Sequence, residues 1–491
     1  MPVDAARLDL AGRRVLVAGL GLSGRAATQA LTARDAAVTT LDARSEQADL
    51  HDDSAVDLGA TDLVIASPGW SPASPVLAAA AARGVPVWSE VELAWRLRAD
   101  RADRAGRGTA GAAAGPAPWL AITGTNGKTT TVGMLASILT AAGLAAPAVG
   151  NVGTPVVEAA VDPELDVLAV ELSSFQLHFT HTMAAHAAVV LNVAPDHLDW
   201  HGSLAAYTAA KARIYERVTV ACVYGARDPL VERLVREADV ADGARAVGTT
   251  SGAPAAGQIG LVDGVIADRA FHAPPDDPAR QRSAAELGTL ADLAHLAGPD
   301  GRVAPHVVAD ALAAAALARA HGVPAAAVRE GLRAYRPGAH RTQLVATVDG
   351  VAYVDDSKAT NAHAAAAALG GVAAGTAVWI AGGLAKGNRF EDLVADRVDR
   401  LRAVVLIGTD QRPWHEALAR HAPAIPVVTI DPADTGTVMS RAVTAARRLA
   451  RPGDTVLLAP ACASMDQFTS YAHRGTAFVD AVGGLGLPAG A

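Results

Sequence analysis

A glycine-rich loop that ends in a lysine and two threonines is the feature of this 491-residue sequence that most directly indicates chemistry. The loop lies between the apolar segment 119–123 and a helical pattern that extends to Leu139. It consists of Gly124, Thr125, Asn126, Gly127, Lys128, Thr129 and Thr130. In such a loop, backbone N–H groups and the lysine surround phosphates, and the threonine after the lysine ligates Mg²⁺. The spacing predicts an ATP-binding loop in which Lys128 is catalytic.

Three polar side chains follow in the same part of the chain, at positions that suit a metal-dependent ATPase. Glu171 lies at the end of the apolar segment 166–172, where a strand would present its carboxylate to the metal of a bound nucleotide. His197 comes after the apolar segment 187–193, and histidine is a metal ligand at neutral pH. Lys211 lies in a helical pattern, in a chain with only four lysines among its 42 Lys and Arg residues. An ordinary surface cation is therefore not expected at Lys211, and lysine, unlike arginine, can lose its proton.

A second glycine motif, near the amino terminus, also indicates phosphate binding. Gly19, Gly21 and Gly24 form a GxGxxG pattern between an apolar segment and a helical pattern, and Asp42 ends the next apolar segment. This arrangement is typical of dinucleotide sites, in which the acid binds a ribose hydroxyl. Residues 67–70 (SPGW) follow a further apolar segment and add a loop to the same edge of the predicted sheet. The motif by itself leaves NAD and other nucleotide diphosphates open.

Three loops near the carboxyl terminus follow apolar segments and carry polar residues of the kind that bind anions. They are residues 355–361, 382–387 and 461–468. In the last loop, Ser464 and Gln467 have the spacing of a capping box, which predicts a helix that begins there and attracts a carboxylate. Three such loops on one edge of a sheet indicate a binding site rather than three unrelated turns.

The composition is that of a packed globular protein with small-molecule partners. Hydrophobic residues make up 51% and charged residues 19% of the chain, and a net charge of -8 gives no electrostatic reason to expect nucleic-acid binding. The two cysteines, Cys222 and Cys462, lie far apart and suit a reducing compartment as small core residues. The amino terminus lacks the pattern of a signal peptide, and no apolar stretch is long enough to cross a bilayer. We therefore expect a cytoplasmic protein without membrane insertion.

Apolar segments alternate with alanine-rich helical stretches along the whole chain, which predicts an α/β fold with mainly parallel sheets. Residues 99–117, rich in Gly, Ala and Arg, have no apolar periodicity and are predicted to form a flexible linker. The sequence RPGAH at 336–340 marks another boundary. The prediction is a Rossmann-like domain at 1–98, a central phosphate-loop domain at 118–336 and a carboxyl-terminal Rossmann-like domain at 337–491.

Five motifs of the central region together resemble the Mur ligase family. They are GTNGKTT (124–130), GNVG (150–153), ELSSFQL (171–177), NVAPDHLDWHG (192–202) and KARIYE (211–216). The resemblance continues to the end of the chain and implies the use of ATP and two Mg²⁺ ions. It also implies that Thr129 and Glu171 hold one Mg²⁺, while His197 and a carbamylated Lys211 hold the other, so that all four are metal ligands. A neutral lysine can react with CO₂ to form the carbamate, which arginine cannot do.

In one place the chain departs from the family pattern. The segment 303–320 resembles the stretch usually written HNxxNALAA, but Val307 and Asp310 replace both asparagines. The asparagine contact to ATP that the family implies is therefore not expected in the same form.

The three carboxyl-terminal loops resemble those of the family members that add D-glutamate, and the DNPR and HHPTE motifs of other members are absent. The resemblance implies that D-glutamate is surrounded by Thr360, Lys386, Ser464, Met465 and Tyr471. It implies that further nucleotide contacts come from Arg341, Asp356 and Lys358. It implies that a UDP-linked substrate, rather than NAD, is bound by Leu22, Ser23, Asp42, Arg44, Gly69, Asn151, Ser173 and Gln176.

The reaction implied by the resemblance is ATP-dependent formation of an amide bond between UDP-MurNAc-L-Ala and D-glutamate, through an acyl phosphate. We expect a monomer whose partners are these two small molecules and ATP. Three alternatives stay open: a ligase of the same family with another amino-acid specificity, an NAD-linked oxidoreductase fused to an ATP-binding module, and a non-catalytic nucleotide-driven switch.

Overall fold

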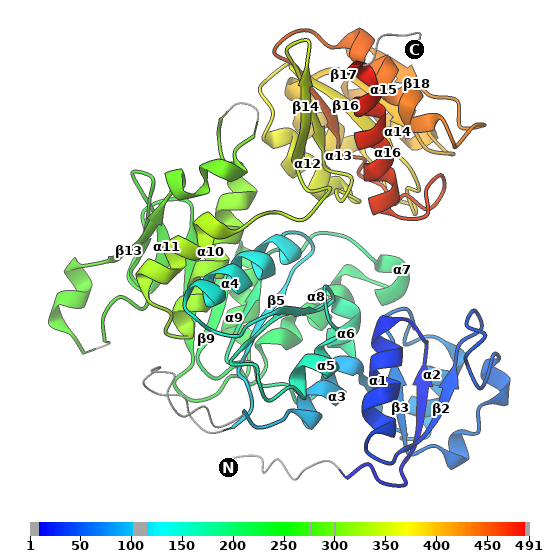
Figure 1. The fold of residues 1–491 in the computed structure, drawn as a ribbon, viewed down its shortest axis with the longest axis vertical. Coiled ribbons are helices and arrows are strands. Elements are labelled where there is room, and N and C mark those ends of the chain that lie inside the picture. The colour runs from blue at the N-terminus through cyan, green and yellow to red at the C-terminus, as the bar shows by residue number, and fades with distance from the viewer. Residues whose placement is uncertain (1–8, 102–114, 275, 299–300, 487–491) are drawn as a thin grey trace. The chain divides into compact units, whose positions relative to one another are not determined.

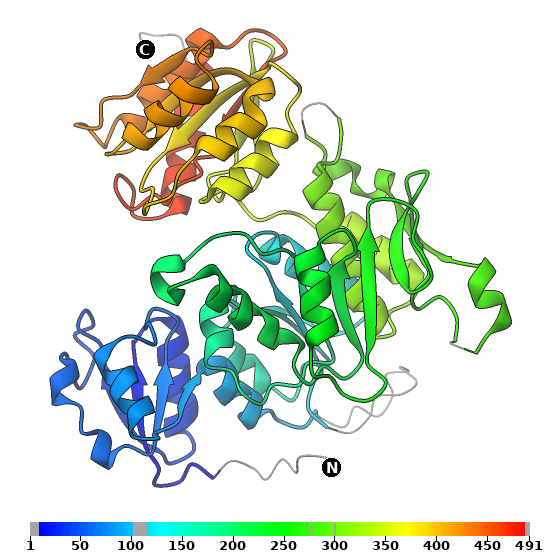
Figure 2. The same cartoon turned by 180° about the vertical axis from the view of Figure 1, so that it is seen from behind.

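The computed structural model describes residues 9–101, 115–274, 276–298 and 301–486. The chain forms two compact units (Figures 1 and 2). The first unit contains the chain up to residue 292 together with 309–335, and the second contains 293–308 and the chain from 336 onward. In the described residues, the first unit holds two sheets and the second holds one, and mainly parallel strands confirm the predicted α/β class. Most of the predicted linker, residues 102–114, lies outside the described residues.

The amino-terminal sheet contains four parallel strands in the order β2-β1-β3-β4. Its strands are β1 (Arg14–Ala18), β2 (Ala37–Leu41), β3 (Leu63–Ala66) and β4 (Val87–Ser89), and its helices are α1 (Leu22–Thr32), α2 (Pro75–Ala82) and α3 (Glu90–Leu97). All four residues of β3 are apolar and buried, as expected for a central parallel strand. Because parallel strands end at the same edge, the GxGxxG loop, Asp42 and residues 67–70 are gathered there.

The central sheet contains nine strands in the order β13-β12-β11-β10-β9-β8-β5-β7-β6. The strands are β5 (Trp119–Thr123), β6 (Ala148–Gly150), β7 (Leu168–Glu171), β8 (Ala187–Val190), β9 (Ala221–Gly225), β10 (Arg245–Thr250), β11 (Gln258–Val262), β12 (Val265–Asp268) and β13 (Ala285–Thr289). The helices are α4 (Lys128–Ala141), α5 (Val156–Ala160), α6 (Ser174–His178), α7 (Leu198–His201), α8 (Leu204–Ala212), α9 (Pro229–Glu237), α10 (Pro305–Ala320) and α11 (Ala325–Ala334). The seven strands β5 to β11 are parallel, and β12 and β13 add an antiparallel edge. Since β5 lies between β7 and β8, the phosphate loop after β5 is flanked by the ends of both neighbours.

The sheet of the second unit contains six strands in the order β14-β15-β19-β16-β17-β18. The strands are β14 (Gln343–Val348), β15 (Val351–Asp355), β16 (Ala377–Gly382), β17 (Leu401–Ile407), β18 (Val427–Thr429) and β19 (Thr455–Leu458). The helices are α12 (Ala362–Gly370), α13 (Glu391–Arg397), α14 (Arg412–His421), α15 (Val438–Leu449) and α16 (Tyr471–Gly483). Only β14 is antiparallel to its neighbour. The last strand, β19, inserts between β15 and β16, so the three predicted anion-binding loops follow three adjacent strands.

The two sheets of the first unit share one hydrophobic core. Leu93 of α3, Trp119 of β5 and Val157 of α5 belong to the same cluster of buried apolar side chains. Trp95 packs edge-on against Trp119, with ring centroids 5.1 Å apart. Because removing this apolar surface from water is favourable, the amino-terminal sheet is held against the central sheet.

One predicted helix start is wrong. Residues 464–468 form a turn, and α16 begins at Tyr471 with Ser470 as its cap. The Oε1 atom of Gln467 accepts the N–H of Gly408 at 2.8 Å instead of completing a local capping box. A tertiary contact from the end of β17 therefore replaces the predicted helix start.

Two further expectations can be compared with the structure. Cys222 and Cys462 are both unpaired and buried, which confirms that they are core residues. Among the described residues, no helix has the length and apolar character needed to cross a membrane.

Candidate active site

The phosphate loop joins β5 to α4 and is braced by its own lysine. Gly127 caps α4 with a φ of +84°, a backbone conformation that favours glycine. The Nζ of Lys128 donates to the carbonyl oxygens of Gly124 and Thr125, both at 2.9 Å. A side chain at position 127 would collide with the carboxylate of Asp310, one of the two departures from the family pattern. Asp310 therefore lies directly against the phosphate loop.

A hydroxyl and a carboxylate meet beside this loop. The Oγ1 of Thr129 donates to Oε2 of Glu171 at 2.8 Å, and the Nδ2 of Asn151 donates to Oε1 at 2.8 Å. Glu171 is almost completely buried at the end of β7. Each carboxylate oxygen of Glu171 thus has a side-chain donor, and Oε2 is hydrogen-bonded to Thr129, the residue predicted to bind the same Mg²⁺.

Lys211 is a buried lysine and not a surface cation. Its side chain, only 2% exposed, projects from α8 to the phosphate loop, where Nζ donates to the carbonyl oxygen of Gly124 at 2.8 Å. The Nζ also lies 4.6 Å from the centre of the Tyr207 ring. Burial, followed by repulsion from the Lys128 ammonium, lowers the pKa of Lys211 well below its ordinary value. Burial therefore shifts Lys211 toward its neutral amine form.

His197 also lies near the Tyr207 ring. The ring centroids of His197 and Tyr207 are 6.5 Å apart, and the backbone of His197 has a φ of +53° at the start of α7. The Nε2 of His197 lies 3.6 Å from Oδ2 of Asp196, and the ring packs edge-on against Phe175. His197 and Lys211 therefore both lie near the ring of Tyr207.

Asp42 organises the glycine loop of the amino-terminal sheet. Its Oδ2 accepts the N–H of Leu20 at 2.8 Å, and its Oδ1 accepts the N–H of Arg44 at 2.9 Å. The hydrogen bond from Leu20 and then that from Arg44 lower the pKa of Asp42. At the same edge, Leu22 is exposed and a Cβ at Gly69 would meet open space. The predicted UDP-binding residues of this sheet thus share an edge, but the oxygens of Asp42 are already used by the backbone.

The helix after β7 begins with a capping box made by two predicted substrate-binding residues. The Oγ of Ser173 accepts the N–H of Gln176 at 3.2 Å, and the Oε1 of Gln176 accepts the N–H of Ser173 at 2.9 Å. Gln176 is buried. The pair fixes the direction of the chain immediately after Glu171, and Asn151 approaches the same glutamate from β6.

In the second unit, the three predicted loops contact one another. Ala461 N–H donates to the carbonyl oxygen of Ala359 at 2.9 Å, and Leu384 N–H donates to that of Ala463 at 2.9 Å. These hydrogen bonds join the loop after β19 to the loops after β15 and β16. The structure therefore gathers the predicted carboxyl-terminal residues at one sheet edge.

Within this edge the predicted residues differ in how they are held. Lys358 places Nζ 3.9 Å from the centre of the Tyr471 ring, and Ser464 is buried, whereas Met465 and Lys386 are exposed. Asp356 accepts the N–H of Thr342 through Oδ1 at 3.2 Å. Thr360 and Arg341 are both partly buried. Desolvation raises the pKa of the Asp356 carboxyl group.

Arg474 is a buried residue of this edge that the sequence does not single out. It is 1% exposed, and its guanidinium donates to Oγ and the carbonyl oxygen of Ser357 and to the carbonyl oxygen of Cys462. Burial lowers its pKa to about 10. Arg474 therefore joins the loop after β15 to the loop after β19, a structural contact that was not predicted from the sequence.

The fold and the phosphate loop together define a nucleotide-binding α/β protein of the phosphate-loop class. Two family descriptions match the chain: "Mur ligase middle domain" over residues 122–259, and "Mur ligase, glutamate ligase domain" over residues 340–462. The relative from Streptomyces avermitilis named UDP-N-acetylmuramoylalanine--D-glutamate ligase is 56% identical, with 97% of this chain and 99% of the relative covered. The relative of that name from Bifidobacterium adolescentis is 47% identical and covers 96% of this chain and 97% of its own length. The chain belongs to the Mur ligase family.

Solved structures show the same fold at low sequence identity. A pseudomurein peptide ligase type C from Methanothermus fervidus matches with a TM-score of 0.53 and 17% identity, over 91% of this chain and 96% of its own. UDP-N-acetylmuramate-alanine ligase from Thermotoga maritima matches with a TM-score of 0.53 and 16% identity, over 96% of this chain and 99% of its own. These likenesses confirm the three-domain α/β fold.

Proposed function

We propose that the chain is an ATP-dependent ligase that joins D-glutamate to UDP-N-acetylmuramoyl-L-alanine in the synthesis of peptidoglycan precursors. The observation that carries the proposal is the near full-length likeness, at 56% identity, to a ligase whose name states this product. The phosphate loop with its Thr129–Glu171 contact supports the use of ATP. The reaction belongs in the cytoplasm, where we also propose that the chain acts as a monomer.

The proposed reaction has two steps. In the first, the alanyl carboxylate attacks the γ-phosphorus of ATP, which releases ADP and leaves an acyl phosphate. In the second, the amine of D-glutamate attacks the acyl carbon and loses a proton, and phosphate leaves as the amide bond forms. The first step brings together a carboxylate and a triphosphate, so charge neutralisation and alignment are the main tasks of the site. Lys128 and the N–H groups at the start of α4 perform these tasks on the phosphate side.

Mg²⁺ fits the oxygen donors next to the loop. The hydroxyl of Thr129 and the carboxylate of Glu171 already converge at 2.8 Å, and hard oxygen ligands of this kind suit Mg²⁺. Bound there, Mg²⁺ would neutralise phosphate charge as a Lewis acid. Asn151 keeps the carboxylate of Glu171 in the required direction through its hydrogen bond to Oε1.

We assign a second cation to His197 and a carbamate on Lys211. The neutral amine that burial favours at Lys211 is the reactant for carbamate formation, and the product is an anion in place of a cation. A cationic Lys211 would instead repel a metal ion. The Oδ2 atom of Asp196 lies 3.6 Å from Nε2 of His197 and adds negative charge next to this site.

The amino-acid and UDP sites are assigned to two different sheet edges. We assign D-glutamate to the edge of the second unit that carries Thr360, Lys386, Ser464, Met465 and Tyr471, where a lysine and loop N–H groups suit two carboxylates. We assign UDP to the edge of the amino-terminal sheet that carries Leu22, Ser23, Asp42, Arg44 and Gly69, with Asn151, Ser173 and Gln176 toward the phosphate loop.

Phosphate release by the purified chain tests this proposal. The chain is mixed with ATP, Mg²⁺, UDP-MurNAc-L-Ala and one of D-glutamate, L-glutamate, L-alanine or diaminopimelate. Release should require both the UDP substrate and D-glutamate. Release only with another amino acid would replace the proposed specificity with that of a different family member. A nicotinamide-dependent absorbance change would instead support the oxidoreductase reading, and the absence of any amino-acid dependence would support a nucleotide switch.

A further inference from the structure

Helix α3 of the amino-terminal sheet carries two glutamates that are buried for different reasons. Glu90 is 1% exposed and Glu92 is fully buried, although both lie in the first turn of a helix that begins at the end of β4. Acidic residues in a first turn are usually solvated partners of the helix dipole. Here Glu90 has its partner in α5, and Glu92 has its partners in the segment after α6.

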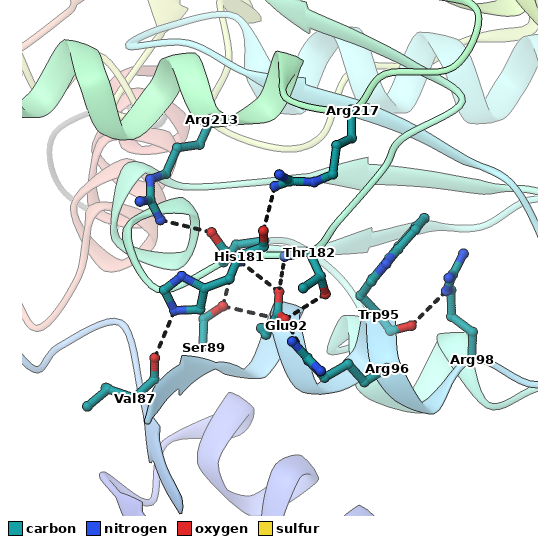
Figure 3. A network of polar contacts seen from close by, with 11 residues as sticks. Val87, Ser89, Glu92, Trp95, Arg96, Arg98, His181, Thr182, Arg213 and Arg217 are labelled. Atoms are coloured by element: carbon teal, nitrogen blue, oxygen red, sulfur yellow. Dashed lines mark hydrogen bonds and ion pairs between the residues drawn. The ribbon is translucent and has the colours of Figure 1, made fainter. Parts of the chain in front are cut away.

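Glu92 is a fully satisfied anchor (Figure 3). Its Oε2 accepts the N–H groups of His181 and Thr182, at 2.7 and 2.8 Å, and its Oε1 accepts the Thr182 hydroxyl at 2.6 Å. The Nε of Arg96 donates to Oε1 at 2.7 Å. Next to Glu92, the Ser89 hydroxyl lies 2.9 Å from the hydroxyl of Thr180. Thr180 belongs to the same segment after α6 as His181 and Thr182. Glu92 thus fastens α3 to this segment and leaves no carboxylate oxygen without a donor.

Glu90 contacts α5, and only one of its two carboxylate oxygens has a hydrogen-bond partner in the described part of the chain. Its Oε1 accepts the N–H of Val157 in the first turn of α5, at 3.0 Å. Its Oε2 is buried and has no hydrogen-bond partner in the described part of the chain. The side chain of Gln176 lies close enough to lower the pKa of the carboxyl group, an effect opposed by burial. A carboxyl group in this position is unfavourable for stability alone, because apolar side chains occupy such positions at lower cost.

The two elements that Glu90 contacts both lead to Glu171. The chain before α5 carries Asn151, whose side chain donates to Oε1 of Glu171 and whose N–H donates to its carbonyl oxygen at 2.9 Å. The chain after Glu171 carries the Ser173–Gln176 capping box. A displacement of α5 or α6 by a fraction of an ångström would therefore change the direction of Asn151 or of the cap.

We propose that Glu90 is a positioning residue of the ligase: by holding the start of α5 and bordering Gln176, it sets Asn151 and the Ser173–Gln176 cap on the two sides of Glu171. This inference rests on the proposed function, in which those three residues contact the UDP substrate. Lys128 lies outside this set of contacts, whereas Glu171 lies inside it. Glu90 therefore acts mainly on the UDP substrate and, through Glu171, to a smaller extent on the Mg²⁺ site.

The experiment compares E90M, E90Q and E92M with the unaltered chain. Methionine at position 90 keeps the length of the side chain but removes both oxygens, whereas glutamine keeps an acceptor for the Val157 N–H. We expect E90M to raise the KM for UDP-MurNAc-L-Ala by about tenfold and the KM for ATP by no more than about threefold, since small misplacements of binding groups have effects of this size. In E90Q the KM for the UDP substrate should stay within about threefold of that of the unaltered chain, because only one hydrogen bond is weakened.

E92M is the matched control, because it removes a neighbouring buried carboxylate that does not contact α5 or Gln176. It should lower the melting temperature more than E90M does and leave the KM for the UDP substrate within about twofold. An unaltered KM in E90M, or an equal increase in E92M, would overturn the inference while the proposed function stands. If the unaltered chain shows no release of phosphate that depends on D-glutamate, the proposed function fails, and this inference fails with it.

Discussion

The buried carboxyl group of Glu90 should make the stability of the first unit depend on pH in the range from 4.5 to about 7. Burial raises the pKa of Glu90 from its ordinary value of 4.5 to about 7, against the opposing contributions of the Val157 N–H and the Gln176 side chain. Glu158 of α5 is the charged neighbour that raises it further. Since the pKa is higher in the folded chain than in the unfolded chain, the contribution of Glu90 to stability is fully present below pH 4.5 and is lost as the pH rises through about 7.

The size of the effect follows from the pKa. A rise from 4.5 to about 7 corresponds to a free energy of about 3 kcal/mol. In a folded unit of this size, about 1 kcal/mol changes the melting temperature by about 2 °C, so the effect is about 6 °C. E90Q has no titrating group at this position and keeps the shape of the side chain. Between pH 4.5 and pH 8 the unaltered chain should therefore lose about 6 °C more than E90Q does.

Scanning calorimetry of both chains across this pH range measures the difference directly. Other titrating groups, such as His201, whose pKa burial lowers to about 4, act equally in both chains and cancel. Parallel pH profiles for the two chains would show that the carboxyl group is ionised in the folded protein and would refute the argument from burial. A relative gain of stability by the unaltered chain as the pH rises would refute the sign.

Three further changes test the centre around the phosphate loop. K211R should reduce phosphate release by about a hundredfold or more, and added bicarbonate should not restore it, because arginine cannot form a carbamate; turnover near that of the unaltered chain would make Lys211 a structural residue. T129A should raise the Mg²⁺ concentration needed for half-maximal activity by about tenfold, since one oxygen ligand is lost; an unchanged Mg²⁺ requirement would place the ion elsewhere. D310N should lower the KM for ATP by about threefold, because a carboxylate next to the phosphate loop repels the triphosphate; an increase would show that the carboxylate is needed as an acceptor.

The site residues at the sheet edges could be predicted because polar residues suited to binding or catalysis directly follow apolar segments of the sequence. Glu171 ends β7 and the phosphate loop follows β5, and a parallel sheet brings such ends to one side. What the sequence does not contain is the order of strands. The loop at 461–468 lies between its two partners only because β19, the last strand in the chain, inserts between β15 and β16. The failed capping box has the same origin, since Gln467 turns to Gly408 at the end of a strand that is distant in sequence.

Buried charges were the residues that local patterns could not identify. Glu90 and Glu92 match the acidic first turn of an ordinary helix, and Arg474 lies among polar residues of α16. Each is buried by elements far away in the sequence, such as α5 for Glu90. Periodicity describes which face of a helix is apolar, but it does not indicate when a charged residue is covered by another part of the fold.

The scarcity of lysine was a further signal in the sequence, beside the motifs, and the structure describes the surroundings of all four lysines. Lys128 and Lys211 both donate to the carbonyl oxygen of Gly124, and Lys358 lies over the ring of Tyr471. At the buried Lys211, arginine could not supply a neutral amine, because a guanidinium keeps its proton. Lys386 is different: it is exposed, with a φ of +51°. Its role toward D-glutamate therefore depends on the family resemblance alone, and among the four lysines it is the one for which replacement by arginine is most informative about the amino-acid site.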